Sequence, residues 1–555
     1  MVRVNFQPSN LSIEVEKGTT ILEAARRAGV LIESPCNAAG TCGKCKVKVD
    51  SQSLARIMQK GEHGLSQEEK IQGYVLACQA YLEGNIDVEI IQEEKNQNLK
   101  ILSAGKSLAL ELDSYIKKEF NQTENLTRVY AGKELLAVEA GDTEMANYGV
   151  VVDIGTTTVV VSLVQLNTGE ELAFTTSLNP QSLQAQDVLS RIKFASEENG
   201  LAIMHNELLK EINRMIDQIV RETNLCRDNI YEAVFSGNTC MLHLAIRVSP
   251  YSLGQYPYTP KVKGGNQLSA ANLGLDISQV GLIYLPPVIS AYVGADITSG
   301  ILATKLYEQE GVNLFVDIGT NGELVIGVNG QLTAASTAAG PAFEGMNIAC
   351  GMRAGSGAIE LFNVEENGAI TIKTIGGGGA TGICGSGLID IVGELVDHGI
   401  IGQNGRLLEN SKEASPLGEK LVRSNGKLVF NLIDQVFLSQ KDIRQVQLAK
   451  GAIRAGIELL LKDKGLQPID VDRVLIAGSF GYHLRAESLI NIGLLPKEFL
   501  GKIEFLGNTS KSGGQAILLN QRYRKQMEDL VREVEVLELA NCQDFQQIFV
   551  DCLNF

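Results

Sequence analysis

Hydrophobic and polar residues alternate in different ways along the chain, and the change marks off a small N-terminal unit from a longer region. Near the N-terminus, VRVNF and LSIEV alternate like the two strands of a hairpin. Thr20 and Glu23 then have the spacing of a helix capping box, and Gly29 is placed to end that helix. Residues 1–92 are therefore expected to form a small α+β domain.

The longer region begins after a polar run, QEEKNQNLK. Apolar density falls and charge rises there, so we expect a linker over residues 93–126. Strand patterns then alternate with helical periods, such as LAIMHNELLKEINRMIDQIV, which is typical of an α/β architecture. One strand pattern, VVVDIGTTTVVV from Val150, returns as LFVDIGTNGELVI from Leu314. This repeat predicts two related halves, about 127–310 and 311–555.

Length and charge limit the functional classes. A chain of 555 residues is too long for one hydrophobic core, and a net charge of −16 opposes binding to nucleic acid or to an anionic membrane. The sequence has no run of 18 apolar residues and no apolar segment near its N-terminus, so neither a transmembrane helix nor a signal peptide is expected. We expect a cytoplasmic protein whose scattered cysteines are free thiols: Cys226, Cys240, Cys350, Cys384, Cys542 and Cys552.

The other four cysteines have the spacing of a metal or cluster site. CNAAGTCGKC places Cys36, Cys42 and Cys45 in a C-x5-C-x2-C loop, and Cys78 lies 33 residues further on. Four thiolates can hold a tetrahedral zinc ion or a 2Fe-2S cluster. Three ligands in one glycine-containing loop favour the cluster, because zinc ribbons usually pair their ligands in two knuckles. The spacing resembles that of adrenodoxin-like ferredoxins, which implies a β-grasp fold and a 2Fe-2S cofactor.

The repeated hairpins have the chemistry of phosphate-binding turns. Each places an aspartate, Asp153 or Asp317, at the end of a strand, followed by glycine and by hydroxyl or amide side chains. Glycine lets the backbone approach a phosphate, and the turn's N–H groups and hydroxyls can donate to its oxygens. The aspartates would hold Mg²⁺ and orient an attacking water. Two such turns from opposite halves could clamp one nucleotide between them.

Other polar turns could line the same cleft. Strand VLIA is followed by a Gly-Ser-Phe-Gly turn, and Gly385 opens a helix whose N-terminus could receive a phosphate or a ribose. Ser236 to Asn238 follow a strand and could also face the nucleotide. Asp187 and Arg191, four residues apart, could line the cleft or form an ordinary surface ion pair. The turn at 340–345 could equally pack between domains.

Resemblances to two groups of known proteins relate these patterns to one another. The two Asp-Gly turns and the late glycine turn resemble the phosphate and adenosine loops of the acetate kinase/sugar kinase/Hsp70/actin superfamily, which implies an actin-like ATPase with duplicated ribonuclease H-like halves. Together with the ferredoxin cysteines, the order DIGTTT, GNTCM, VDIGTNGE, AAGPAFEG, GICGSG, AKGAI and AGSFG resembles the ATP-dependent reductive activators of corrinoid proteins. That resemblance implies transfer of one electron from a 2Fe-2S cluster to Co(II), regenerating Co(I), coupled to ATP hydrolysis.

The resemblance also implies partners and site residues. The partners would be a corrinoid protein and an upstream low-potential electron donor, and the chain could form a homodimer. The cluster ligands would be Cys36, Cys42, Cys45 and Cys78, and Mg²⁺ and water would be served by Asp153 and Asp317. The nucleotide would be bound by Gly155, Thr156, Thr157, Gly319, Thr320, Asn321, Gly385, Ser386, Gly387, Gly478, Ser479 and Gly481.

Three other functions account for part of the pattern. A small-molecule kinase with a redox-sensing ferredoxin domain would need a base beside the γ-phosphate, and the sequence identifies none. An activator of 2-hydroxyacyl-CoA dehydratases would hold a 4Fe-4S cluster between two subunits and would lack the N-terminal ferredoxin. A nucleotide-gated chaperone or scaffold of the Hsp70 type would not need the four clustered cysteines.

Overall fold

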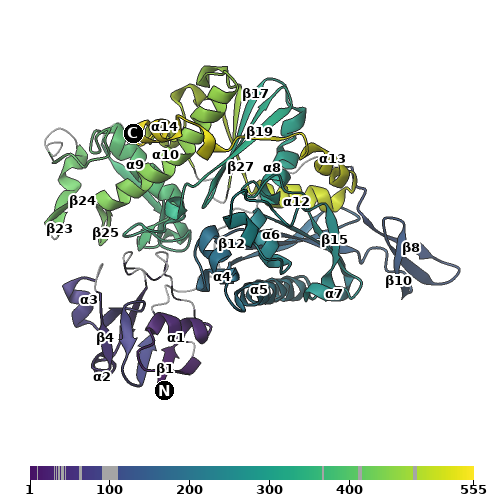
Figure 1. Ribbon diagram of the computed structural model, residues 1–555, viewed down its shortest axis with the longest axis horizontal. Helices are drawn as coiled ribbons and strands as arrows, with labels where there is room; N and C mark the ends of the chain where they lie inside the picture. The colour runs from purple at the N-terminus through teal and green to yellow at the C-terminus, as the bar shows by residue number, and fades with distance from the viewer. Residues whose placement is uncertain are drawn as a thin grey trace.

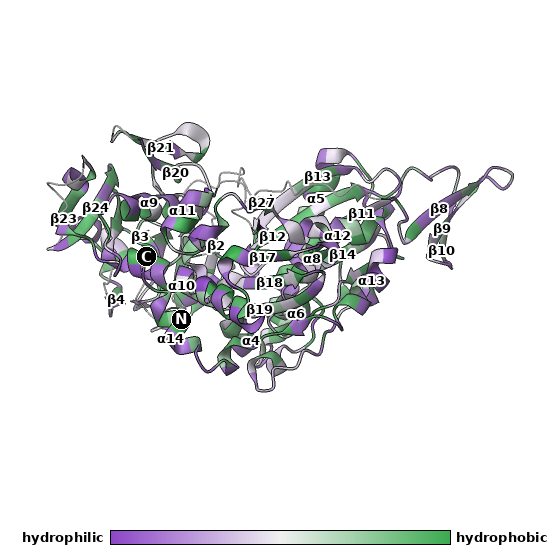
Figure 2. Cartoon of the chain, turned by 90° about the horizontal axis from the view of Figure 1, so that it is seen from above, coloured by the Kyte–Doolittle hydropathy of each residue, from purple (hydrophilic) through white to green (hydrophobic). Residues whose placement is uncertain are grey.

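The chain folds into a small N-terminal domain and a larger α/β body, from which a three-stranded sheet projects at one end (Figures 1 and 2). The hydrophobic clusters lie within these sheets and under the helices that cover them. The computed structural model describes residues 1–8, 11–30, 32, 34, 38, 40, 43, 45–61, 65–90, 111–365, 368–409, 416–424, 426–478 and 484–555.

The N-terminal domain is a five-stranded mixed sheet covered by helix α1 (Ile21–Arg27). The predicted hairpin is confirmed, since the first two strands pair antiparallel from Val2–Val15 to Phe6–Leu11. The Thr20 side chain accepts from the Glu23 amide at 3.1 Å, so the helix begins where its cap predicts. The strand order is β2 (Leu11–Val15), β1 (Val2–Gln7), β7 (Ile86–Glu89), β3 (Lys46–Val49) and β5 (Tyr74–Leu76).

Smaller elements complete this domain. Two short strands pair beside the main sheet, and two short helices begin at side-chain caps from Asp50 and Ser66. These elements are β4 (Ile57–Gln59), β6 (Ala80–Leu82), α2 (Ser51–Leu54) and α3 (Gln67–Ile71).

The expected linker is too long. Strand β8 (Ile116–Asn121) lies inside the range 93–126 and pairs antiparallel with β9 (Leu126–Ala131), which in turn pairs with β10 (Glu134–Ala140). The strand IKKEFN alternates buried and exposed side chains, and its lysines and glutamate gave the segment the charge of a linker. Residues 91–110 lie outside the described residues.

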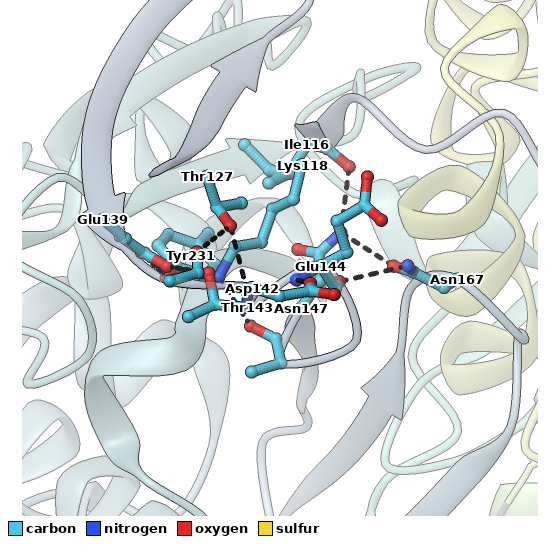
Figure 3. A network of polar contacts seen from close by, with 12 residues as sticks. Ile116, Lys118, Thr127, Glu139, Asp142, Thr143, Glu144, Asn147, Asn167 and Tyr231 are labelled. Carbon is cyan, nitrogen blue, oxygen red and sulfur yellow. Dashed lines mark hydrogen bonds and ion pairs between the residues drawn. The ribbon is translucent and has the colours of Figure 1, made fainter. Parts of the chain in front are cut away.

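A polar network around a buried lysine attaches the three-stranded sheet to the body (Figure 3). The fully buried ammonium of Lys118 donates to Glu139 at 2.6 Å, to the Ala146 carbonyl at 3.0 Å and to the Tyr231 hydroxyl at 3.1 Å. All three of its N–H groups therefore have acceptors. Burial raises the pKa of Glu139, but hydrogen bonds from Lys118, Thr143 and Tyr231 outweigh burial and leave that pKa below its usual value.

The two halves of the body share one sheet topology, as the repeated hairpin predicts. In each half the strand that carries the aspartate pairs antiparallel with the strand after it and parallel with a later strand. The first sheet has the order β13 (Glu171–Leu178), β12 (Thr158–Gln165), β11 (Tyr148–Ile154), β14 (Ile230–Gly237), β16 (Leu282–Leu285) and β15 (Asn266–Ser269). The second has the order β27 (Ile503–Gly507), β26 (Arg473–Ala477), β17 (Val312–Ile318), β18 (Gly322–Val328), β19 (Gln331–Thr337) and β28 (Glu535–Val536).

Helices cover both sheets, and small sheets extend the second half. The first half carries α4 (Val188–Ala195), α5 (Gly200–Thr223), α6 (Thr239–Ala245) and α7 (Ala270–Leu273). The second carries α9 (Gly385–Asp397), α10 (Gln440–Asp463), α11 (Ala486–Asn491) and α14 (Phe545–Asp551). Its small sheets are formed by β20 (Ala358–Val364), β21 (Ile370–Thr374) and β22 (Gly382–Ile383), and by β23 (Leu421–Ser424), β24 (Lys427–Ile433) and β25 (Val436–Ser439).

Two helices pack against each other where the halves meet. Helix α8 (Ala295–Thr304) leads from the first half into β17, and α12 (Thr509–Leu519) returns from β27 to contact β11 and β14. A Cβ atom at Gly513 would lie 1.9 Å from the Ser299 carbonyl oxygen, so only glycine permits this approach. Helix α13 (Arg522–Leu530) follows, and none of the described helices is long and apolar enough to cross a membrane.

Candidate functional site

The repeated turns lie at equivalent ends of the two sheets. Asp153 is the penultimate residue of β11, and Asp317 is the penultimate residue of β17. The amide of Gly155 donates to the Thr158 carbonyl at 2.9 Å, and a Cβ atom there would lie 2.7 Å from that carbonyl oxygen. The glycine is therefore required by the first turn itself. In the second turn, the Gly319 amide donates to the Asn321 carbonyl, also at 2.9 Å.

The structure brings the two turns together. The hydroxyl oxygens of Thr157 and Thr320 lie 3.4 Å apart, although one belongs to the first half and the other to the second. Both hydroxyls also contact the carboxylate of Glu344, in the short helix Pro341–Glu344. The expectation that the turns face each other across one site is confirmed as geometry.

A second feature of the site is a group of carboxyl groups that raise one another's pKa. Burial and the charge of Asp153 raise the pKa of Asp317 to about 7. Burial, and then the charges of Asp317 and Asp153, raise the pKa of Asp296 to about 8. The pKa of Glu323 is raised by burial and by the charges of Asp296 and Asp317. Such a concentration of negative charge suits a divalent cation.

These carboxyl groups do not by themselves form a complete metal cage. Within the described part of the chain, no three or more acidic, histidine or cysteine side chains are grouped closely enough to hold a metal ion. Mg²⁺ usually keeps several waters and takes further oxygens from phosphates, so one or two of these carboxylates are enough for it. The residues therefore fit Mg²⁺ bound together with a nucleotide.

Asp153 is fixed by the start of α12, a contact that the sequence does not reveal. Asn508 Nδ2 and Ser510 Oγ each donate to one of its carboxylate oxygens at 2.7 Å. Burial raises the pKa of Asp153, and these two hydrogen bonds oppose the rise. Asn508 also caps α12, since its Oδ1 accepts from the Lys511 amide at 2.8 Å. In the sequence this segment therefore resembles an ordinary helix start.

Buried and partly buried polar side chains donate hydrogen bonds to the first turn. Asn179 donates to the Gly155 carbonyl at 2.8 Å, and Asn238 donates to the Thr156 hydroxyl at 3.1 Å. Arg191 is fully buried and donates to the Thr156 carbonyl, so of the two alternatives for Asp187 and Arg191 the surface ion pair is wrong. Burial lowers the pKa of Arg191 to about 10.

The Gly-Ser-Phe-Gly turn predicted after strand VLIA begins beside the second hairpin. Gly478 directly follows β26 and has a φ of 112°, and a Cβ atom there would lie 2.3 Å from the Ile318 carbonyl oxygen. This position is therefore beside the end of β17 and admits only glycine. Ser479 and Gly481 lie outside the described residues, so their contact with adenosine stays a prediction.

The glycines at the start of α9 have a clear packing role. The Ser386 hydroxyl donates to the Glu360 carbonyl at 2.9 Å, and a Cβ atom at Gly387 would lie 2.1 Å from the Ile359 carbonyl oxygen. Gly385, the first residue of the helix, is buried as well. These contacts pack α9 against β20, and their use in nucleotide binding stays a prediction.

Two of the four clustered cysteines are described, and they lie together. The Sγ atoms of Cys45 and Cys78 are 3.2 Å apart, and both side chains are buried in the core of the N-terminal domain. Hydrogen bonds, first from the Cys45 thiol and then from Gln79 and the Gly40 amide, outweigh burial and lower the pKa of Cys78 to about 6. Donors that stabilise a thiolate suit a cluster ligand. Cys36 and Cys42 lie outside the described residues.

Comparisons with known families account for nearly the whole chain. Residues 4–83 match the 2Fe-2S iron-sulfur cluster binding domain, which favours the cluster over zinc. Residues 148–309 match the RACo middle region, and residues 311–555 match the C-terminal domain of RACo, the ASKHA domain. The ASKHA match agrees with the actin-like fold expected from the repeated turns.

Two individual relatives align over nearly the full length, and a third aligns over about three quarters of the chain. A solved structure described as a reductive activator for corrinoid, iron-sulfur protein is 31% identical, with a TM-score of 0.74, and the alignment covers 100% of this chain and 98% of that one. The corrinoid activation enzyme RamQ of Eubacterium limosum is 28% identical over 99% of this chain and 98% of its own length. A Co(II) methylated amine-specific corrinoid protein reductase of Methanosarcina barkeri is 24% identical over 74% of this chain and 77% of its own. The chain therefore belongs to the family of reductive activators of corrinoid proteins.

Proposed function

We propose that this protein restores corrinoid proteins to their active state by passing one electron to cobalt, at the expense of ATP. The observation that supports this most strongly is the full-length alignment with a reductive activator, in which both the 2Fe-2S domain and the ASKHA domain are retained. In the transfer, the reduced cluster loses one electron and Co(II) gains it to become Co(I). The kinase and scaffold alternatives lack this support.

The need for ATP follows from the redox potentials. Reducing Co(II) to Co(I) requires a more negative potential than the roughly −400 mV of a plant-type 2Fe-2S cluster. Each 59 mV of shortfall costs about a factor of ten in a one-electron equilibrium. Binding and hydrolysis of ATP between two halves that can close on it supply the missing free energy. We infer that closure alters the complex with the corrinoid protein so that the transfer becomes favourable.

Within the cleft, we assign roles by chemistry. The hydroxyls and amides of the two turns would bind phosphate oxygens, and Asp153 and Asp317 would hold Mg²⁺ and orient the attacking water. Asp296 and Glu323 add to the negative field that attracts the cation, while Asn508 and Ser510 keep the Asp153 carboxylate in place. Mg²⁺ would neutralise the charge that develops on the phosphates during hydrolysis.

In the N-terminal domain, Cys36, Cys42, Cys45 and Cys78 are proposed to hold the cluster, which serves as a one-electron carrier. After each transfer the cluster must be reduced again, so an upstream low-potential donor is required. Residues 1–92, a linker that ends before β8, and the two halves of the ATPase region are our proposed domains. A homodimer and a cytoplasmic location stay predictions from the sequence.

The test is a cobalt absorbance assay. The anaerobically purified protein, with its cluster reduced, is mixed with Co(II) corrinoid proteins taken from methyltransferase systems and from acetyl-CoA synthesis. We expect the Co(I) absorbance band to form with at least one of them, only when Mg²⁺ and ATP are present. Formation of Co(I) at the same rate and to the same extent without nucleotide would contradict the coupling.

A further inference from the structure

One carboxylate joins the two phosphate turns directly. Glu344 Oε2 accepts a hydrogen bond from the Thr157 hydroxyl at 2.5 Å, and its Oε1 accepts one from the Thr320 hydroxyl at 2.7 Å. Thr157 belongs to the first half of the body, whereas Thr320 and Glu344 belong to the second. The carboxylate therefore forms a bridge between the two halves.

The backbone around Glu344 holds this carboxylate in place. The two residues before it, Ala342 and Phe343, are buried in the core of the second half. Gly345 follows with a φ of 76°, and a Cβ atom there would lie 2.4 Å from the Met352 carbonyl oxygen. A residue between a packed aromatic side chain and an obligatory glycine has little freedom to move its backbone.

The surroundings of Glu344 are those of an anion site. The described residues include no lysine or arginine within ion-pair distance of it, so its two direct donors are neutral hydroxyls. The charge of Arg191, which supports the first turn, acts on it from further away. Two converging hydroxyls, with a buried cation bonded to the neighbouring Thr156 carbonyl, would bind a phosphate oxygen equally well.

A hydroxyl has a single hydrogen to donate. While Thr157 and Thr320 donate to Glu344, neither can donate to a phosphate, and two anions cannot share the space between them. We propose that Glu344 and the terminal phosphate of ATP are alternative acceptors for these two hydroxyls, so that ATP must release the Glu344 bridge while ADP need not. Glu344 thus sets the preference between ATP and ADP. This inference rests on the proposed nucleotide site.

The proposal predicts a selective gain of affinity when the carboxylate is removed. In Glu344→Gln the amide cannot accept from both hydroxyls, and in Glu344→Ala nothing competes. We expect both variants to bind the non-hydrolysable analogue AMPPNP with Mg²⁺ about tenfold more tightly than wild type, because two charge-assisted hydrogen bonds no longer have to be broken. Their affinity for ADP should stay within about twofold of wild type, because ADP does not compete for those bonds.

The experiment is isothermal titration of the full-length protein with AMPPNP and with ADP. Glu365→Gln is a matched control, because Glu365 also accepts from a threonine hydroxyl, Thr371 at 3.2 Å, but is exposed on the turn after β20. An unchanged AMPPNP-to-ADP preference in Glu344→Gln, or weaker AMPPNP binding, would overturn the proposal. Thr157→Val in the Glu344→Ala background tests the site itself, because the hydroxyl has no competing carboxylate there. If AMPPNP binds this double variant as tightly as it binds Glu344→Ala, it is the proposed phosphate turn that fails.

Discussion

At the scale of single residues, the buried carboxyl groups beside the two turns make the stability of the protein depend on pH. The folded chain raises the pKa of Asp317 from its ordinary 3.8 to about 7. A carboxyl group with a raised folded-state pKa contributes stability that is fully present below its unfolded pKa and is lost as pH rises through the folded one. Without a divalent cation, the wild type therefore loses stability at this site as pH rises from about 4 to about 7.

Asp317→Asn should remove that loss. Its amide cannot ionise, so we expect the variant to match wild type near pH 4 and to become more stable by about 2–4 kcal/mol above pH 7. Denaturant unfolding of both proteins across this pH range, followed through the ATPase region, measures the difference. Adding Mg²⁺ with ADP should shrink it at pH 8. A constant difference at every pH would show that Asp317 is charged throughout the range.

The residue scale also shows what the sequence could not reveal. Asp153 and Asp317 were identified because each carries its glycine turn with it in a short local pattern. Asp296 and Asn508 lie outside both repeats, and nothing in their local sequence sets them apart from helix caps or surface residues. The turn at 340–345 was noted in the sequence, but nothing there singled out Glu344 as a contact of both repeated turns. Only the folding of the two halves against each other brings them to the site.

At the scale of elements, the repeated strands were predictable and the projecting sheet was not. Runs of mainly apolar residues buried on both faces identify β11 and β17 as central strands. Strand β8 is instead half polar, and its most important side chain is a lysine. A buried lysine looks like a surface lysine in the sequence until its acceptors are known.

The buried Lys118 and the exposed Lys117 should contribute very differently to the attachment of the β8–β10 sheet. In Lys118→Ala, the partly buried Glu139 loses its cation and the cavity is left unfilled, so we expect the attachment of the β8–β10 sheet to weaken by about 2–4 kcal/mol. Lys117→Ala removes an exposed partner of Asp113 and should cost no more than about 0.5 kcal/mol. Amide hydrogen exchange over residues 116–140 measures both. Equal exchange in the two variants would mean that the network in Figure 3 does not attach the sheet.

At the scale of the whole molecule, the ferredoxin domain and the ATPase region are separate domains of one chain, each with its own hydrophobic core. Among the described residues, the hydrophobic cluster that contains Cys45 and Cys78 is formed only by residues between Val2 and Ile90. The proposed nucleotide site is formed by the two sheets of the body and the helices between them. Damage confined to the cleft should therefore leave the environment of the cluster unchanged.

Asp317→Ala tests this separation together with the role of the aspartate. Loss of its carboxylate removes a proposed Mg²⁺ and water contact, so ATP hydrolysis should fall at least about 100-fold and ATP-dependent Co(I) formation should stop. The visible spectrum of the cluster per mole of protein should stay as in wild type. Asp397→Ala, which removes an exposed carboxylate at the end of α9 in the same half, should change neither property. Loss of the cluster spectrum in Asp317→Ala would mean that the two domains depend on each other for folding, whereas undiminished hydrolysis would remove Asp317 from the reaction.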